Sequence, residues 1–180
     1  MTEKLIVIDP GHGGGDPGAV NGSKHEKDAT LAIAKKVACK LIEAGYRVAL
    51  TRSTDRELTL AERCRFSNEK GADAFISIHL NAASNKTAEG LETWRYQNVG
   101  HTTKKLADDV HAELIAATGA VNRGVKTTTA FYVLKHTKAP AILVECGFIS
   151  NSAECKDLFN ATYQAKIAQA IAKGVKRAIR

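Results

Sequence analysis

Three short apolar runs in the chain each lead to residues that can bind a metal ion or transfer a proton. The runs and these residues are Leu5–Ile8 with Asp9 and His12, Ala74–Ile78 with His79, and Ala141–Val144 with Glu145. Apolar runs without polar alternation are typical of strands that are buried on both faces, as in a parallel sheet covered by helices. Because ligands of such sheets bind beyond the carboxyl ends of the strands, the pattern predicts a cleft that contains two imidazoles and a carboxylate.

Between and after these runs, apolar residues recur at the spacing of amphipathic helices. The predicted helices are Lys24–Ala44, Thr59–Lys70, His101–Thr118 and Tyr163–Ile179, and the further predicted strands are Tyr46–Thr51, Leu91–Tyr96 and a short one near Phe131–Leu134. Alternating strands and helices indicate βαβ units with right-handed crossovers. We therefore expect one α/β domain over residues 1–180, a three-layer α/β/α sandwich around a twisted, mostly parallel sheet of five or six strands.

Length and composition agree with one soluble domain, since 180 residues, of which 44% are hydrophobic, suffice for a single well-packed core. The apolar runs are far shorter than the roughly 20 residues of a membrane span. The segment Met1–Lys4 lacks the features of a signal peptide. We therefore expect a protein that is made in the cytoplasm without a signal peptide and has no membrane partner.

The four cysteines are widely spaced and form no CxxC pair, which favours reduced thiols over disulfides or a zinc finger. One of them, Cys146, follows Glu145 directly. Strand alternation places the two side chains on opposite faces, which argues against thiol catalysis at this position.

The chain is basic, with 26 Lys and Arg against 19 Asp and Glu and a net charge of +7. A basic surface favours polyanionic partners, such as nucleic acid or a cell wall that carries teichoic acid. Aromatic residues make up 6% of the chain and are not interleaved with basic residues as in single-strand binders. We therefore expect no specific nucleic-acid partner, although charge alone does not distinguish the two polymers.

Two histidines and a carboxylate with an open fourth position form a ligand set of zinc hydrolases. His12 and His79 are far apart in the sequence, so only the fold can bring them together. Glu26, in the first turn of the first predicted helix, is a candidate third ligand, but it could equally complement the positive end of that helix. Asp9 is a rival ligand, and we favour for it the role of accepting an imidazole N–H from behind the ligands.

Glu145 ends a buried strand, where an ionised carboxylate is costly unless it is paired. This favours a proton-transfer residue, or else an ion pair with Arg52 or Arg123. Asn81, two residues after His79, could orient the site or begin a turn.

The glycines Gly13, Gly15 and Gly18 satisfy the GxGxxG pattern after a strand. No helix is predicted to begin against them, so a dinucleotide site is not supported. Loop glycines that let the backbone pass close to a metal or substrate explain the same pattern.

Seven stretches, in this order and spacing, resemble the zinc-dependent N-acetylmuramoyl-L-alanine amidases of bacterial autolysins and phage endolysins, the group called amidase type 3. The stretches are residues 8–14, 16–19, 26–27, 50–52, 77–82, 122–125 and 144–151. The resemblance implies that His12, Glu26 and His79 bind one Zn²⁺ per chain and that Glu145 is catalytic. We assign Asn81 and Arg123, which lie in two of the stretches, to substrate binding.

The resemblance also implies hydrolysis of the amide bond between N-acetylmuramic acid and the L-alanine of the stem peptide in peptidoglycan. We expect an endolysin or autolysin catalytic domain that acts on the extracellular cell wall after release. One alternative is a non-catalytic wall- or metal-binding module, which would require the loss of a ligand or of Glu145. A second alternative is another zinc amide hydrolase, such as a carboxypeptidase or a sugar deacetylase.

Overall fold

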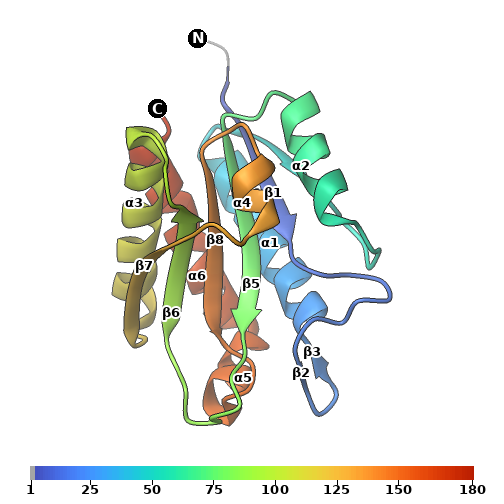
Figure 1. Cartoon of the computed structure of the whole chain (residues 1–180). Coiled ribbons are helices and arrows are strands. Elements are labelled where there is room, and N and C mark those ends of the chain that lie inside the picture. Colours follow the sequence, from blue (N-terminus) through green and yellow to red (C-terminus); the bar gives the residue numbers. More distant parts are fainter. Residues whose placement is uncertain (1–2) are drawn as a thin grey trace.

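A six-stranded sheet runs through the molecule in the order β4-β1-β5-β8-β6-β7, as the computed structural model of residues 3–180 describes it (Figure 1). The strands are β1 (Leu5–Pro10), β4 (Arg47–Leu50), β5 (Ala74–Asn81), β6 (Leu91–Tyr96), β7 (Asn122–Thr128) and β8 (Ala141–Phe148). All neighbouring pairs are parallel except β6 and β8, which are antiparallel. The predicted mostly parallel sheet is therefore confirmed.

Helices cover both faces of this sheet. One layer contains α1 (Glu26–Glu43), α3 (His101–Thr118) and α6 (Ala161–Ala178), and the other contains α2 (Leu60–Glu69) and α4 (Tyr132–His136). Figure 1 shows α4 in front of the sheet and α1 and α6 behind it. A short hairpin, β2 (Val20–Asn21) with β3 (Lys24–His25), precedes α1, and α5 (Ser152–Leu158) follows β8. The three-layer prediction is confirmed, and within residues 3–180 no helix has both the length and the apolar character needed to cross a bilayer.

Strand alternation divides the core into two parts and thereby sets the position of the site. Ile76 and Ile78 of β5 pack toward α1 and α6, whereas Phe75 packs toward α2 and α4. Because side chains two residues apart share a face, His79 lies on the same face as Phe75. The same rule places Glu145 with Leu143 on the α2 and α4 side of β8. The two residues therefore face the layer that contains only two short helices.

The predicted strand near Phe131–Leu134 is wrong, because this segment leads into helix α4. A short apolar run is compatible with a buried strand and with one helical turn, and periodicity cannot separate them. The sixth strand is instead β7, which was not predicted. It lies at the edge of the sheet and is mostly polar, so it lacks the hydrophobic pattern that marks the inner strands.

The cysteines are free, as predicted. Cys146 packs in the core part that contains α1 and α6, on the opposite side of β8 from Glu145. Burial raises the pKa of this thiol far above its ordinary value, so it stays protonated. These facts agree with a structural role for Cys146 rather than thiol catalysis.

Candidate active site

His12, Glu26 and His79 converge at the carboxyl ends of β1 and β5, with one potential ligand atom from each residue lying within 4.8 Å of the others. Glu26 bridges the two histidines. Its Oε2 lies 3.2 Å from His12 Nε2, and its Oε1 lies 3.1 Å from His79 Nδ1. The two imidazole rings meet edge to face, with centroids 5.0 Å apart. The fold therefore brings together the three residues that the sequence suggested as metal ligands.

Local backbone structure holds each of these side chains in place. His12 lies in the loop after β1 and adopts a left-handed conformation, with φ of 60°. Glu26 is the first residue of α1 and is almost fully buried, and its carboxylate accepts hydrogen bonds from the backbone N–H groups of Ala19 and Leu80, each at 2.9 Å. Because its oxygens also reach both histidines, Glu26 does more than complement the helix terminus.

Two glycines make room for the cluster. A Cβ atom added at Gly11 would collide with the ring of His79. At Gly18 it would lie 2.6 Å from His12 Cδ2 and 2.7 Å from Glu26 Oε2. A glycine is therefore required at position 18 because the loop passes close to His12 and Glu26, which explains the last glycine of the GxGxxG pattern. The N–H groups of Glu26 and Lys27, in the first turn of α1, donate to the backbone carbonyls of Ala19 and Pro17 in this loop.

Asp16 orients His12 from the side away from Glu26. Its Oδ2 lies 2.7 Å from His12 Nδ1, which leaves Nε2 directed toward the cluster. The residue also accepts the N–H of Gly18 at 3.0 Å. A carboxylate behind a metal-binding imidazole fixes its tautomer and increases its basicity. We had predicted this role for Asp9 and had not considered Asp16. Its position, four residues after His12 in the same loop, could have suggested the role.

The ionised state of Glu26 suits a divalent cation. Burial alone would raise the pKa of Glu26, but hydrogen bonds and charge interactions with His12 and His79 hold it well below its ordinary value. Burial alone would lower the pKa of His12, but Glu26 and Asp16 outweigh it and raise the pKa to about 9. Glu26 therefore presents a charged carboxylate between two imidazoles, and this set of nitrogen and oxygen donors fits zinc.

Glu145 lies beside this cluster, directly opposite His79 in the register of β5 and β8. Its Oε2 is inaccessible to solvent and has no hydrogen-bond partner among residues 3–180. Burial raises the pKa of this carboxyl to about 7. Neither Arg52 nor Arg123 pairs with it, so the structural alternative of an ion pair is wrong. A carboxyl group with these properties can accept and donate a proton near neutral pH.

The cluster and Glu145 open into a cleft with a volume of about 520 Å³. Its walls come from the loop after β1, from α2 and from α4. The lining residues include His12, Asp16, Leu58, Leu60, Arg63, His79, Phe131, Tyr132, Leu143 and Glu145. The two histidines and the proton-transfer candidate Glu145 thus line one accessible space, and Glu26 is buried behind the histidines.

The structure corrects the role of Asp9, which contacts no imidazole. Its carboxylate accepts hydrogen bonds from Thr51 Oγ1 at 2.6 Å, Ser77 Oγ at 2.8 Å and Arg63 Nη1 at 2.9 Å. A buried carboxylate requires such partners. Arg52 is likewise structural, since it donates to the backbone carbonyls of Pro10 and Gly11. Both residues hold the loop that contains His12.

Asn81 and Arg123 lie outside the lining of the cleft. Asn81 Oδ1 accepts the N–H of Ala82 at 2.8 Å, as in a turn. Arg123 Nε donates to Glu92 Oε1 at 2.6 Å, and its guanidinium lies over the ring of Phe148. Glu92 is the register partner of Glu145 on the adjacent strand β6, so Arg123 reaches the neighbourhood of the site through Glu92.

The chain is similar to one family of known proteins. Residues 6–177 match the profile of the N-acetylmuramoyl-L-alanine amidase family, type 3. The chain is 39% identical to the uncharacterised protein YqiI of Bacillus subtilis, covering 96% of this chain and 83% of that protein. It is 42% identical to the amidase LytC of the same organism, covering 97% of this chain but only 35% of LytC.

Solved structures give the same result. An N-acetylmuramoyl-L-alanine amidase from Clostridium difficile 630 superposes with a TM-score of 0.94 at 37% identity, covering 97% of this chain and 96% of that one. The catalytic domain of the amidase CwlV from Bacillus (Paenibacillus) polymyxa superposes with a TM-score of 0.91 at 36% identity, covering 97% of each chain. On sequence and fold together, the chain belongs to the N-acetylmuramoyl-L-alanine amidase family.

Proposed function

We propose that this protein is a zinc-dependent peptidoglycan amidase, which hydrolyses the amide bond between N-acetylmuramic acid and the L-alanine of the stem peptide. The observation that carries the proposal is the buried, unpartnered Oε2 of Glu145 beside the cluster of two histidines and a glutamate. A domain that only bound the wall would have no need of a costly buried carboxyl at this position. The similarity to LytC and to the Clostridium difficile enzyme, both N-acetylmuramoyl-L-alanine amidases, supports the choice of bond.

His12, Glu26 and His79 would hold one Zn²⁺ per chain. Bound zinc supplies Lewis acidity, which polarises a carbonyl oxygen and lowers the pKa of water. The chain contributes the preorganised donors. Glu26 is kept ionised between the imidazoles, and Asp16 directs His12 Nε2 toward them.

Glu145 carries the proton transfer in this proposal. Its carboxylate takes a proton from the attacking water, and the resulting acid gives that proton to the nitrogen of the leaving L-alanine. Both steps need a group whose pKa lies near the working pH, and burial raises the pKa of Glu145 to about 7. The exchange leaves Glu145 in its starting state after each turnover.

Asn81 and Arg123 are proposed to contact the substrate. Arg123 is partly exposed, and its cation suits a carboxylate of the stem peptide. Asn81 lies at the end of β5, two residues beyond His79. In the cell we propose that the protein degrades the wall as an endolysin or autolysin, acting outside the membrane after release.

A digest of purified peptidoglycan tests the function. Zinc-loaded protein is expected to release new amino groups on L-alanine without new reducing sugar ends and without acetate. A carboxypeptidase would instead release a C-terminal amino acid, and a deacetylase would release acetate. Chelated protein serves as the control, and full activity after exhaustive chelation would contradict the zinc dependence.

A further inference from the structure

The outer surface formed by α1 and α6 carries more positive than negative charge. α6 contains four Lys or Arg residues and no Asp or Glu, and α1 has no acidic residue between Asp28 and Glu43. Helix surfaces of soluble domains usually mix both signs, because oppositely charged neighbours stabilise the helix. Lys36 and Lys40 are instead like charges four residues apart, an arrangement that slightly destabilises a helix.

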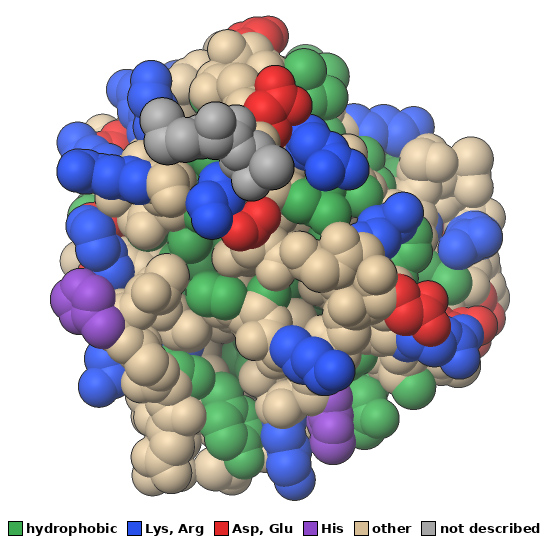
Figure 2. Space-filling model, turned by 90° about the horizontal axis from the view of Figure 1, so that it is seen from above, with side chains coloured by type: hydrophobic (Ala, Val, Ile, Leu, Met, Phe, Trp, Pro, Cys, Tyr) green, Lys and Arg blue, Asp and Glu red, His purple; other side chains and the backbone are tan. Residues whose placement is uncertain are grey.

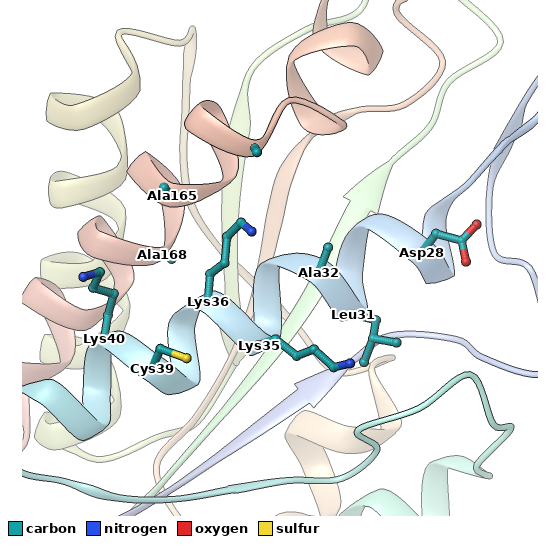
Figure 3. Close-up of a pocket in the computed structure, with 10 residues that line it drawn as sticks. Asp28, Leu31, Ala32, Lys35, Lys36, Cys39, Lys40, Ala165 and Ala168 are labelled. Carbon is teal, nitrogen blue, oxygen red and sulfur yellow. The ribbon is translucent and has the colours of Figure 1, made fainter.

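Lysines line two neighbouring hollows on this surface, which share Lys40 and Ala165. Between α1 and α6 lies a hollow of about 650 Å³ (Figure 3). It is lined by Lys35, Lys36 and Lys40 together with Asp28, Leu31, Ala32 and Cys39 of α1, and by Ala161, Ala165 and Ala168 of α6. Figure 3 shows Lys36 extending from α1 toward α6, where Ala165 and Ala168 present only methyl groups. A second hollow of about 390 Å³ shares Lys40 with the first and adds Lys166 and Lys173. The two together are called the α1/α6 groove below.

Most of these lysines keep their charge available. Lys40 pairs with Glu43 at 2.7 Å. Within residues 3–180, the other four groove lysines, Lys35, Lys36, Lys166 and Lys173, have no acidic partner within 4.0 Å. The end of the molecule near the termini also carries basic side chains, but acidic ones lie among them (Figure 2). There Lys4 pairs with Asp73, and Arg177 pairs with Glu113.

We propose that the α1/α6 groove binds a phosphodiester-linked polyol polymer of the cell wall, with its phosphates on the four unpaired lysines. Charge complementarity supports an anionic polymer. No aromatic side chain lines the groove, so it offers no surface on which nucleic-acid bases could stack. A polymer without bases can lie against the small alanine side chains. The choice of a wall polymer rests on the proposed wall-degrading function.

The position of the groove is compatible with catalysis. α1 and α6 cover one face of the sheet, and the cleft with Glu145 opens on the other. A polymer in the groove therefore leaves the cleft free, and two attachment points on one wall raise the effective concentration of substrate at the cleft. The groove would retain the protein on the wall between successive cleavages.

The test is calorimetric titration of zinc-free protein with purified poly(glycerol phosphate), at about 50 and about 200 mM salt. The test variant carries Lys35→Gln, Lys36→Gln, Lys166→Gln and Lys173→Gln. A control variant with the same loss of charge carries Gln at four exposed lysines elsewhere, Lys86, Lys104, Lys135 and Lys138. We expect the groove variant to bind ~10-fold or more weakly and with a shallower salt dependence, while the control stays within ~2-fold of wild type.

Equal weakening of the two variants would overturn the proposal, since net charge rather than the groove would then cause binding. Tighter binding of wild type to single-stranded DNA of equal charge would also overturn it. If the fourfold variant unfolds, the pairs Lys35→Gln with Lys36→Gln and Lys166→Gln with Lys173→Gln are tested separately, and both must weaken binding. Hydrolysis of a soluble muramyl peptide, measured with zinc, must stay unchanged in the groove variant. Because binding is measured without zinc, the binding result can be interpreted even if the protein has no amidase activity.

Discussion

His79 and Glu145 lie directly opposite each other on the adjacent parallel strands β5 and β8, with both side chains on the sheet face that opens into the cleft. One residue belongs to the metal cluster, and the other supplies an unpartnered carboxyl oxygen. A single register in the middle of the sheet therefore fixes the distance between the candidate metal ligand and the candidate proton-transfer group.

Replacing the carboxyl of Glu145 should separate catalysis from metal binding. We expect Glu145→Gln to lower kcat by ~10²- to 10⁴-fold, the usual contribution of a general acid–base group, with unchanged zinc affinity. Turnover of a muramyl peptide and zinc content by metal analysis measure the two effects. Glu69→Gln, at an exposed position on α2, is the matched control. Retained activity in the Glu145 variant would remove this residue from the mechanism.

The same variant should change the pH dependence of stability in zinc-free protein. Burial raises the pKa of Glu145 to about 7, above the ordinary 4.5. The folded state therefore binds more protons than the unfolded state between these values, and stability falls as pH rises through this window. Glu145→Gln should remove that fall and be more stable at pH 8 by roughly 3 kcal/mol. Urea unfolding from pH 4.5 to 8 checks this, and parallel curves for the two proteins would refute it.

Zinc binding should release a proton from His12. Glu26 and Asp16 raise the pKa of His12 to about 9 in the metal-free protein, so at pH 7.5 its imidazole is largely protonated. An imidazole must be neutral to ligate, so binding displaces that proton. Calorimetric zinc titrations at pH 7.5 in two buffers of different ionisation enthalpy should show about one proton released per ion. Release that is absent at pH 7.5 would show that His12 is already neutral or is not a ligand.

Asp16 should act on metal affinity through His12. Its Oδ2 lies 2.7 Å from His12 Nδ1, so Asp16→Asn removes the charge that orients the ring. We expect a ~10- to 100-fold loss of zinc affinity, typical of the loss of a carboxylate behind a ligating histidine. Competition with a chromophoric chelator measures the affinity. Asp28→Asn, on the exposed side of α1, is the control and should bind zinc as wild type does.

Gly18 and Gly22 form a matched pair for the loop around the cluster. Both have positive φ, 66° and 59°, but a Cβ at Gly18 would lie 2.6 Å from His12, whereas nothing lies within 4 Å at Gly22. Both Ala variants should lose about 1 kcal/mol of stability through backbone strain. Only Gly18→Ala should also lose zinc and activity, because the methyl group displaces His12 and Glu26. Equal zinc binding by the two variants would contradict this packing.

Much of the fold could be predicted because its inner strands and long helices carry strong patterns. The helix predicted over His101–Thr118 and the strand predicted over Leu91–Tyr96 have these same bounds in the structure. The apolar residues of the helix pack in one part of the core, and those of the strand alternate between both parts, so each keeps an uninterrupted period. The edge strand β7 and the short helix α4 were missed because each buries too little apolar surface to carry a period of its own.

The residue types at the strand ends could be predicted from the chain without a structure, since His12, His79 and Glu145 follow buried runs and emerge at one edge of a parallel sheet. The hydrogen-bond partners of the neighbouring carboxylates could be found only in the folded molecule. Asp9 makes no hydrogen bond to an imidazole, because its carboxylate accepts hydrogen bonds from Thr51, Ser77 and Arg63. Asp16 instead contacts Nδ1 of His12, because the loop between them folds back. Alternation along a strand predicts the face on which each side chain lies. Hydrogen bonds between distant segments depend on the conformations of the loops, which cannot be predicted from local sequence patterns.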